Sequence, residues 1–453
     1  IVAMPLLWVV PLGLYLLSFS VAFATNRTPA QLIGATAPVA LLLSAGGLFM
    51  NTGSWWFVMA AAILCLFTVS VALHAALFDR RPDPQHLTAF YLYLAVGGAL
   101  GGVFGALIAP PLFDWTYEHP LLMIAAALAL PMASPFRRLR DLWASGKTAR
   151  RITLWGIAIM LLLSVAGYGA FGIPGSRSMA LAAGGLISLA GLAAIGNRIL
   201  FCAAVASLIL GMGGWEKPSL SAQPGKMSRS FFGVYTIAPR DGGKARLLLH
   251  GTTMHGVQML GSAARERTAT SYYALPSGVG LALSAAPSLF GGQARIDIVG
   301  LGTGTVACYA QPRQRWTFYE IDPLVVEIAR DPRRFTYLPR CLPDAPVRIG
   351  DARLTLEAAL PSSSDLVVVD ALSSDSIPMH LLTQEAFATY RCNLSPAGLL
   401  LVHISHRHLV LAPVVAGAAA RRGWHARQRF YRPTAQDIGR NPHTPSLRVG
   451  VSP

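Results

Sequence analysis

Charged residues are scarce in this chain. They make up 13% of its 453 residues, against roughly 25% in a typical soluble protein, while hydrophobic residues make up 53%. This scarcity excludes an ordinary soluble globular protein for the chain as a whole, and it predicts that part of the chain lies in lipid. Most of the charges come after Trp215, so we expect a membrane part followed by a water-soluble part.

Acidic residues are scarcer than basic ones, with 21 Asp and Glu against 37 Lys and Arg and a formal net charge of +16. The bases are spread along the chain and form no tract in which aromatic and basic residues alternate. The pattern therefore argues against a nucleic-acid partner. Contact with the anionic headgroups of a lipid bilayer is the expected consequence of the positive charge.

Cysteine is also rare, and its spacing indicates no metal centre. No two of the five cysteines form a CxxC pair, and we expect all five to act as small hydrophobic residues, with neither a disulfide nor a zinc site. The histidines likewise lack metal-ligand spacing, so no metal is expected. The cysteines are Cys65, Cys202, Cys308, Cys341 and Cys392.

Long apolar runs fill residues 1–213 and predict a helical transmembrane domain with about eight spans. The runs are Leu6–Phe23, Leu32–Met50, Trp55–Phe78, Leu87–Ile108, Leu121–Met132, Ile152–Phe171, Met179–Ile195 and Ile199–Met212. Seven spans result if the last two runs form one kinked element. Closely spaced glycines in the fourth run predict tight helix packing, with a substrate path as the alternative.

The basic loop from Phe136 to Arg151 sets the expected orientation, because short basic loops face the cytoplasm. Eight spans then place the part after Trp215 outside the cytoplasm, and seven place it inside, so its side stays open. The first residue is Ile1 rather than Met, and we expect upstream sequence to be missing.

Three further regions follow the predicted spans. Residues 214–230 are polar and rich in Pro, Ser and Gly, which predicts a linker. Short strand-like runs over residues 231–290 predict a small β unit. Strands that alternate with helices over residues 291–453 predict an α/β Rossmann-like domain with a parallel sheet.

The stretch Ile296–Pro323 carries the strongest local signal for a ligand site. An apolar run leads into Gly300-Leu-Gly302-Thr-Gly304, a short helical segment follows, and a second apolar run ends in Glu320-Ile-Asp322. Glycines let the backbone approach a ligand, and an acid about twenty residues on is placed to hold ribose hydroxyls. We expect a nucleoside-containing cofactor here, with a tight turn in an ordinary α/β domain as the alternative.

Two more acids, Asp351 and Asp370, also follow apolar runs. Because the carboxyl ends of parallel strands meet at one edge of a sheet, both acids should collect there with Glu320. A row of carboxylates suits a cationic ligand with ribose and adenine groups.

Seven stretches of the soluble half carry a family resemblance. They are RSFFGV (229–234), HGTTMHGVQ (250–258), GLGTG (300–304), YEIDP (319–323), GDAR (350–353), DALSSDSIP (370–378) and HLLTQEAF (380–387). In this order they resemble the spermidine synthase (polyamine aminopropyltransferase) family, and especially the bacterial membrane proteins in which a major-facilitator part is fused to a spermidine synthase part. The resemblance implies a class I methyltransferase-type domain, a location in the bacterial inner membrane and a possible homodimer.

The resemblance implies decarboxylated S-adenosylmethionine as co-substrate and putrescine or another small amine as acceptor. Carried over by position, the cofactor-binding residues are Gly300, Gly302 and Gly304 at the nucleoside, Glu320 at the ribose with Asp322 beside it, Asp351 and Ala352 at the adenine, and Gln258 nearby.

The resemblance also assigns the amine site. Tyr272 or Tyr273 matches a tyrosine near the amine, and Asp370 and Asp375 match a pair of catalytic acids. An amine attacks only when it is deprotonated, so Asp375 is expected to be the general base, while a second acid holds the far ammonium.

The sequence departs from the family pattern where acids are expected. The glycine loop has Thr303 where the family usually has Asp, and His250 also replaces an acid. Two alternatives stay open. One is an S-adenosylmethionine-dependent methyltransferase acting on a membrane-associated substrate. The other is a polyamine transporter or sensor with a non-catalytic nucleoside-binding domain.

Overall fold

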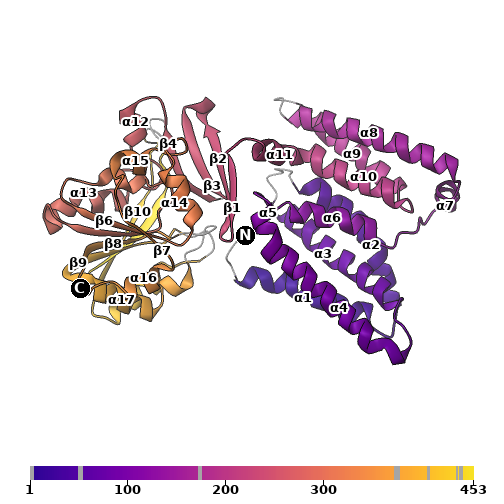
Figure 1. Ribbon diagram of the computed structural model, residues 1–453, viewed down its shortest axis with the longest axis horizontal. Helices are drawn as coiled ribbons and strands as arrows, with labels where there is room; N and C mark the ends of the chain where they lie inside the picture. The colour runs from indigo at the N-terminus through magenta and orange to yellow at the C-terminus, as the bar shows by residue number, and fades with distance from the viewer. Residues whose placement is uncertain are drawn as a thin grey trace. The chain divides into compact units, whose positions relative to one another are not determined.

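The fold is that of a computed structural model, which describes residues 5–48, 55–171, 176–251, 253–371, 378–405, 409–434, 437 and 442–452. The chain divides into two compact units, Met4–Gln223 and Pro224–Pro453. The described part of the first unit is helical, and the second unit combines helices with two β-sheets (Figure 1).

Eight of the described helices of the first unit match the predicted apolar runs, and three short ones lie outside them. In chain order the helices are α1 (Pro5–Ala22), α2 (Thr28–Gly47), α3 (Trp55–Phe78), α4 (Leu87–Val103), α5 (Ala109–Leu112), α6 (Glu118–Ala129), α7 (Arg137–Trp143), α8 (Lys147–Phe171), α9 (Arg177–Ala193), α10 (Arg198–Ile209) and α11 (Glu216–Ser221). A π-helical turn extends α4 over Phe104–Ile108, and another extends α10 over Leu210–Gly214.

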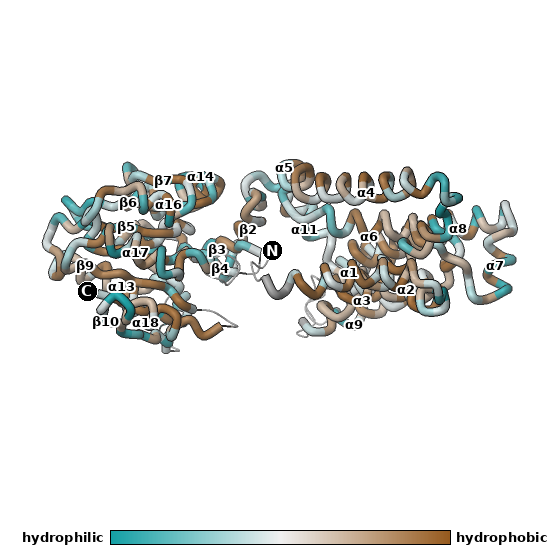
Figure 2. Tube along the Cα trace, turned by 90° about the horizontal axis from the view of Figure 1, so that it is seen from below, coloured by the Kyte–Doolittle hydropathy of each residue, from teal (hydrophilic) through white to brown (hydrophobic). Residues whose placement is uncertain are grey.

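Four stretches of helix within the described residues are long and apolar enough to cross a membrane: Thr28–Gly47, Trp56–Phe78, Pro84–Leu112 and Lys147–Ala170. The other four predicted spans correspond to shorter apolar helices. Hydrophobic colouring predominates along α1, α3 and α6 in Figure 2. Large apolar side chains such as Tyr93, Trp155 and Leu162 are exposed on this unit, which is the pattern expected of a surface that meets lipid.

The glycines of α4 do not pack as predicted. A Cβ atom built on Gly97, Gly98, Gly101, Gly102 or Gly105 would meet no described atom within 4 Å. The prediction of tight helix packing around these glycines within the chain is therefore wrong for the residues that the structure describes.

The second unit begins with a four-stranded antiparallel sheet in the order β1 (Met227–Ser230), β2 (Gly233–Arg240), β3 (Ala245–His250) and β4 (Thr253–Met259). Residues 214–230, predicted to be a linker, thus include α11 and β1. Met227–Ser230 pairs with β2, so backbone hydrogen bonding overrides the polar composition of this segment.

The main sheet has seven strands in the order β10-β11-β9-β8-β5-β6-β7. Its strands are β5 (Arg295–Val299), β6 (Arg315–Glu320), β7 (Val347–Ile349), β8 (Ser364–Val369), β9 (Leu394–His403), β10 (His425–Tyr431) and β11 (Ser446–Ser452). β5 pairs in parallel with both β6 and β8, so the chain order reverses beside it, while β11 is antiparallel to β9 and β10. Ligands of open parallel sheets bind beyond the carboxyl ends of the strands at such a reversal.

Helices cover both faces of this sheet. One core contains side chains of α13 (Gly278–Phe290), α14 (Pro323–Arg330) and α15 (Tyr337–Cys341), and the other contains those of α16 (Ala352–Glu357), α17 (Gln384–Asn393) and α18 (Ala412–Ala420). A short helix, α12 (Ala263–Arg267), precedes α13. The central strands read as continuous apolar runs because both of their faces are buried. The predicted Rossmann-like α/β domain is confirmed.

Two local findings refine the sequence predictions. The short helical segment after the glycine loop is a five-residue 3-10 helix, Thr305–Tyr309, so it offers little helix dipole to a ligand. Cys308 and Cys341 form a disulfide, against the expectation of five unpaired cysteines. They lie 33 residues apart in sequence, but the packing of the 3-10 helix against α15 brings their Cα atoms within 4.9 Å.

Candidate active site

Five parallel strands deliver the candidate site residues to one edge of the main sheet. β5, β6, β7, β8 and β9 run in the same direction, so their carboxyl ends meet there. Glu320 ends β6, Asp351 follows β7, Asp370 follows β8 and His403 ends β9. The structure therefore brings together the three acids that the sequence placed at this edge, and it adds a buried histidine.

The glycine loop follows β5 with positive φ angles of 98° at Gly300, 54° at Gly302 and 76° at Gly304. A Cβ atom on Gly300 would lie 2.6 Å from the backbone oxygen of Asp370, so a side chain there would force the loop away from β8. Thr303 is fully buried and its hydroxyl lies 2.8 Å from that of Thr305. The loop thus packs tightly, and Thr303 supplies no charge to the edge.

Glu320 is a buried carboxylate with hydrogen-bonding capacity left over. Its two oxygens accept backbone N–H groups of Leu301 at 2.9 Å and Asp322 at 3.1 Å. Burial raises the pKa of Glu320, and the backbone N–H groups oppose that rise. Each carboxylate oxygen can accept a further hydrogen bond, so Glu320 can take the two hydroxyls of a ribose.

Asp322, by contrast, is used within the fold. One carboxylate oxygen caps α14 by accepting the N–H of Leu324 at 2.9 Å. The other accepts the hydroxyls of Ser230 at 2.5 Å and Tyr235 at 2.8 Å. These contacts join α14 to the small β-sheet, which gives Asp322 a structural role in this geometry.

Gln258 is also satisfied internally. Its side chain is fully buried, its amide N–H groups bind the backbone oxygen of Glu266 and the hydroxyl of Thr336, and its oxygen accepts the N–H of Thr336. Since both ends of the amide are occupied, Gln258 holds β4 to the segment before α15 rather than presenting a free group to a cofactor.

Asp351 caps α16 and keeps one oxygen for another partner. Oδ1 accepts the N–H groups of Arg353 and Leu354, while Oδ2 lies 3.0 Å from Nε2 of His380. Ala352 is buried directly after it at the start of the helix. An adenine amino group could bind Asp351 at this position only by sharing or displacing His380.

Asp370 lies in a buried cluster with His403, Arg448 and Ser405. Its Oδ1 is 2.5 Å from Nδ1 of His403, and its Oδ2 is 3.2 Å from Nη2 of Arg448. The exposed fractions of these three side chains are 2%, 2% and 1%. Nε2 of His403 lies 2.8 Å from the hydroxyl of Ser405, which itself accepts the N–H of Leu447 at 2.8 Å.

Hydrogen bonding and burial together define the charges in this cluster. An ionised carboxylate only accepts hydrogen bonds, so Nδ1–H of His403 donates to Asp370, while Nε2 of the ring faces the Ser405 hydroxyl. Burial lowers the pKa of His403, in agreement with a neutral ring. Burial alone would raise the pKa of Asp370, but Arg448 and His403 outweigh it and hold this pKa below its usual range.

The two predicted tyrosines border this cluster. The rings of Tyr272 and His403 have centroids 5.1 Å apart, and those of Tyr272 and Tyr273 are 4.4 Å apart. Tyr273 is buried, and its hydrogen bond to Asp370 helps to lower the pKa of that acid. The structure therefore brings together Tyr272, Tyr273 and Asp370, whereas the predicted base Asp375 lies outside the described residues.

Sequence reasoning missed Arg448 and His403. His403 ends β9, and a lone histidine after an apolar run carries little signal. Arg448 interrupts an apolar alternation in Ser446–Ser452, and this single charge in a strand-like run could have marked it. Among the described residues, no three His, Cys, Asp or Glu side chains group as they would to hold a metal.

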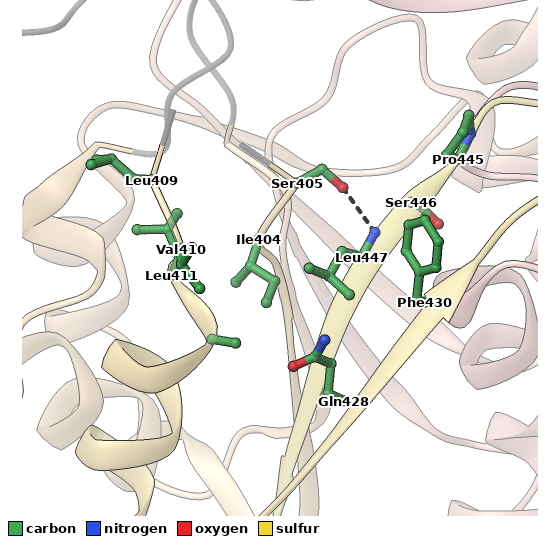
Figure 3. Close-up of a pocket in the computed structure, with 11 residues that line it drawn as sticks. Ile404, Ser405, Leu409, Val410, Leu411, Gln428, Phe430, Pro445, Ser446 and Leu447 are labelled. Carbon is green, nitrogen blue, oxygen red and sulfur yellow. Dashed lines mark hydrogen bonds between the residues drawn. The ribbon is translucent and has the colours of Figure 1, made fainter. Parts of the chain in front are cut away.

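A cavity of about 380 Å³ lies near the same edge, at the ends of β9, β10 and β11 (Figure 3). Its lining is mainly apolar and includes Leu409, Val410, Phe430 and Leu447, with the Ser405 hydroxyl at its border. None of the site residues predicted from the sequence lines it. Through Ser405 the cavity adjoins the His403–Asp370 pair.

Comparisons with known proteins find similarity to polyamine aminopropyltransferases over part of the chain. No family model matches the chain. Over 114 residues it is 34% identical to a polyamine aminopropyltransferase from Vibrio vulnificus (strain CMCP6), covering 24% of the chain and 37% of that protein. Over 124 residues it is 32% identical to a probable polyamine aminopropyl transferase from Bifidobacterium longum (strain NCC 2705), covering 27% of the chain and 26% of that protein.

Among solved structures, a probable spermidine synthase from Corynebacterium glutamicum ATCC 13032 is similar with a TM-score of 0.38 at 18% identity, covering 50% of the chain and 79% of that structure. The two curated relatives are matched over about a third of their length or less. The fold and these partial similarities therefore define an α/β domain with a seven-stranded sheet that is similar, over part of the chain, to polyamine aminopropyltransferases.

Proposed function

We propose that the α/β unit is an aminopropyltransferase, which moves the aminopropyl group of decarboxylated S-adenosylmethionine to a small amine. The observation that carries this proposal is the placement of Glu320 and Asp351 beside a glycine loop, at the edge where the strand order reverses. The similarity to aminopropyltransferases supports the same reaction.

In the proposed reaction the amine nitrogen forms a bond to the carbon next to the sulfonium sulfur. The carbon–sulfur bond breaks, and methylthioadenosine leaves with the electron pair. The sulfonium is already a good leaving group, so positioning of the two substrates supplies much of the rate. Glu320 is proposed to hold the ribose, Asp351 with Ala352 the adenine, and Tyr272 and Tyr273 to line the amine site.

The attacking amine must lose a proton, and Asp375 remains our proposed base for this step. Asp370 is less suited to that role, because its carboxylate already forms an ion pair with Arg448 and accepts a hydrogen bond from His403.

We also propose that the helical unit lies in a bacterial inner membrane. Four helices of sufficient length and the exposed apolar side chains on that unit support this. The basic residues around α7, among them Arg137, Arg138 and Arg140, support a cytoplasmic position for this loop.

One observation favours a second candidate, a methyltransferase that uses S-adenosylmethionine. A row of acids disfavours the carboxylate of S-adenosylmethionine, but Arg448 cancels the charge of Asp370 and Thr303 adds none. The affinities of the full-length protein for the two nucleosides distinguish the candidates. Calorimetry should show tighter binding of the decarboxylated compound, and a clear preference for S-adenosylmethionine would reject the aminopropyltransferase proposal.

A further inference from the structure

Asp370 has a cation supplied by the chain itself. Oδ2 faces Nη2 of Arg448 at 3.2 Å and Oδ1 faces the imidazole of His403 at 2.5 Å. Both partners are buried with it, so the carboxylate is enclosed by protein groups. A substrate ammonium that used Asp370 would have to replace one of these partners.

The charges of the cluster sum to zero. Asp370 contributes one negative charge and Arg448 one positive charge, while the complete burial of the His403 ring favours its neutral form. A second ammonium brought to this place would meet the guanidinium without a free carboxylate to balance it. Like charges in a poorly solvated site repel one another strongly.

Backbone register and packing fix Arg448 in this position. On β11 it lies directly opposite His403 of β9. A Cβ atom on Gly278, at the start of α13, would lie 3.2 Å from Cβ and Cγ of Arg448, so the glycine leaves just the room that this side chain needs. The guanidinium is held by the fold rather than by a flexible surface contact.

The remaining donors of Arg448 indicate what the site can accept. Nε and Nη1 are buried and have no hydrogen-bond partner among the described residues. Buried donors without partners are unfavourable, and an oxygen atom satisfies them whereas an ammonium cannot. The cluster therefore suits a neutral oxygen-bearing group better than a second positive charge.

We propose that Arg448 determines which acceptor binds. Its guanidinium occupies the place on the Asp370 carboxylate where the far ammonium of a diamine would bind, so the acceptor is an amine with one positive charge and a hydroxyl at its far end. This inference rests on the proposed aminopropyl transfer, and it replaces putrescine as the expected acceptor. Asp370 then serves to hold Arg448 rather than the substrate.

Two acceptors of equal chain length test the proposal on the full-length protein in detergent. Putrescine and 4-aminobutan-1-ol differ only in the far group, ammonium against hydroxyl. With decarboxylated S-adenosylmethionine, the amino alcohol should have a kcat/KM at least about tenfold higher than putrescine. A preference for putrescine of similar size would overturn the proposal, and so would equal use of the two amines.

Variants assign the preference to Arg448. Arg448→Met should shift the ratio of the two kcat/KM values toward putrescine by at least about tenfold. Arg429→Met is the matched control, because Arg429 pairs across from Arg448 on β10 but is exposed, and its ratio should stay at the wild-type value. An unchanged ratio in folded Arg448→Met would overturn the assignment. If this variant does not fold, Arg448→Gln replaces it, because the neutral amide can still donate a hydrogen bond to Asp370, and it should shift the ratio in the same direction.

Failure of the transfer reaction is distinguishable from failure of this inference. If neither amine is consumed although the nucleoside binds, the proposed function fails, and calorimetry of both amines with the methylthioadenosine-loaded protein then decides the inference. Tighter binding of the amino alcohol would support the role of Arg448. Tighter binding of putrescine, or no binding of either amine, would overturn it.

Discussion

Arg448 and Asp370 form an ion pair of 3.2 Å between Nη2 and Oδ2, and both side chains are almost completely buried. The two residues come from strands far apart in sequence, β11 and the end of β8, and they meet at the edge where the candidate ligand-binding residues collect. An acid that resemblance assigns to the substrate is thus engaged within the fold.

Removing one partner of this pair should destabilise the α/β unit. Arg448→Met leaves Asp370 buried without its cation, and breaking a buried pair in this way costs about 3–5 kcal/mol. The Asp370→Asn/Arg448→Met double variant should recover much of that loss, because no unpaired charge remains. Denaturant unfolding of the four proteins of this double-mutant cycle measures the coupling, and additive effects would contradict the pair described here.

Acidification should weaken the folded state through His403 first. Its folded pKa lies below the unfolded value of about 6.5, so the stabilisation is present above that pH and is lost as the pH falls toward the folded pKa. Asp370 also has a lowered pKa, and its contribution disappears only below about pH 3.9. Between about pH 7 and pH 5, the free energy of unfolding should fall less steeply in His403→Gln than in the wild type, by up to about 1.4 kcal/mol per pH unit. Identical slopes would contradict the neutral, buried state of His403.

Glu320 should be needed for nucleoside binding. Glu320→Gln removes the charge and one acceptor oxygen, so the affinity for methylthioadenosine should drop by at least about tenfold. Glu327→Gln on α14 is the matched control, because that side chain is 65% exposed and should leave the affinity unchanged. Calorimetry measures the affinity of each variant for methylthioadenosine, and equal affinities would show that Glu320 does not bind the nucleoside.

The disulfide should be detectable by thiol alkylation. In the denatured but unreduced protein, Cys65, Cys202 and Cys392 should react, and Cys308 and Cys341 should react only after reduction. Mass spectrometry reads the number of labels, and five labels before reduction would contradict the disulfide.

Loss of the disulfide should also lower stability. Closing a loop of 33 residues stabilises the fold by about 3–4 kcal/mol in the chain-entropy account. Cys308→Ser should show most of this loss in denaturant unfolding, whereas Cys392→Ser, at an exposed free thiol, should not. Equal free energies of unfolding for the two variants would show that the disulfide does not stabilise the fold.

Hydrophobic patterns predicted the α/β fold well, because parallel strands are buried on both faces and therefore read as apolar runs. Acids that follow such runs lie at the carboxyl edge of the sheet. The three carboxylates Glu320, Asp351 and Asp370 were located in this way. Local sequence could not show how each polar side chain is used. Asp322 caps a helix, and Gln258 binds Glu266 and Thr336 through contacts that only tertiary packing creates.

Long-range pairings were the main source of error. Cys308 and Cys341 have no diagnostic spacing, and their proximity depends on how the 3-10 helix packs on α15. Arg448 reaches Asp370 because β11 inserts antiparallel between β9 and β10, a topology that no short motif encodes.

The most direct test of the central claim is a mass-spectrometric product assay on the purified full-length chain in detergent. Decarboxylated S-adenosylmethionine is supplied with 4-aminobutan-1-ol or putrescine, and S-adenosylmethionine is supplied with the same amines in parallel. We predict methylthioadenosine together with an aminopropylated amine, and loss of both in Asp375→Asn and Glu320→Gln. S-adenosylhomocysteine from the parallel reactions, with no aminopropylated product, would contradict the account and identify a methyltransferase.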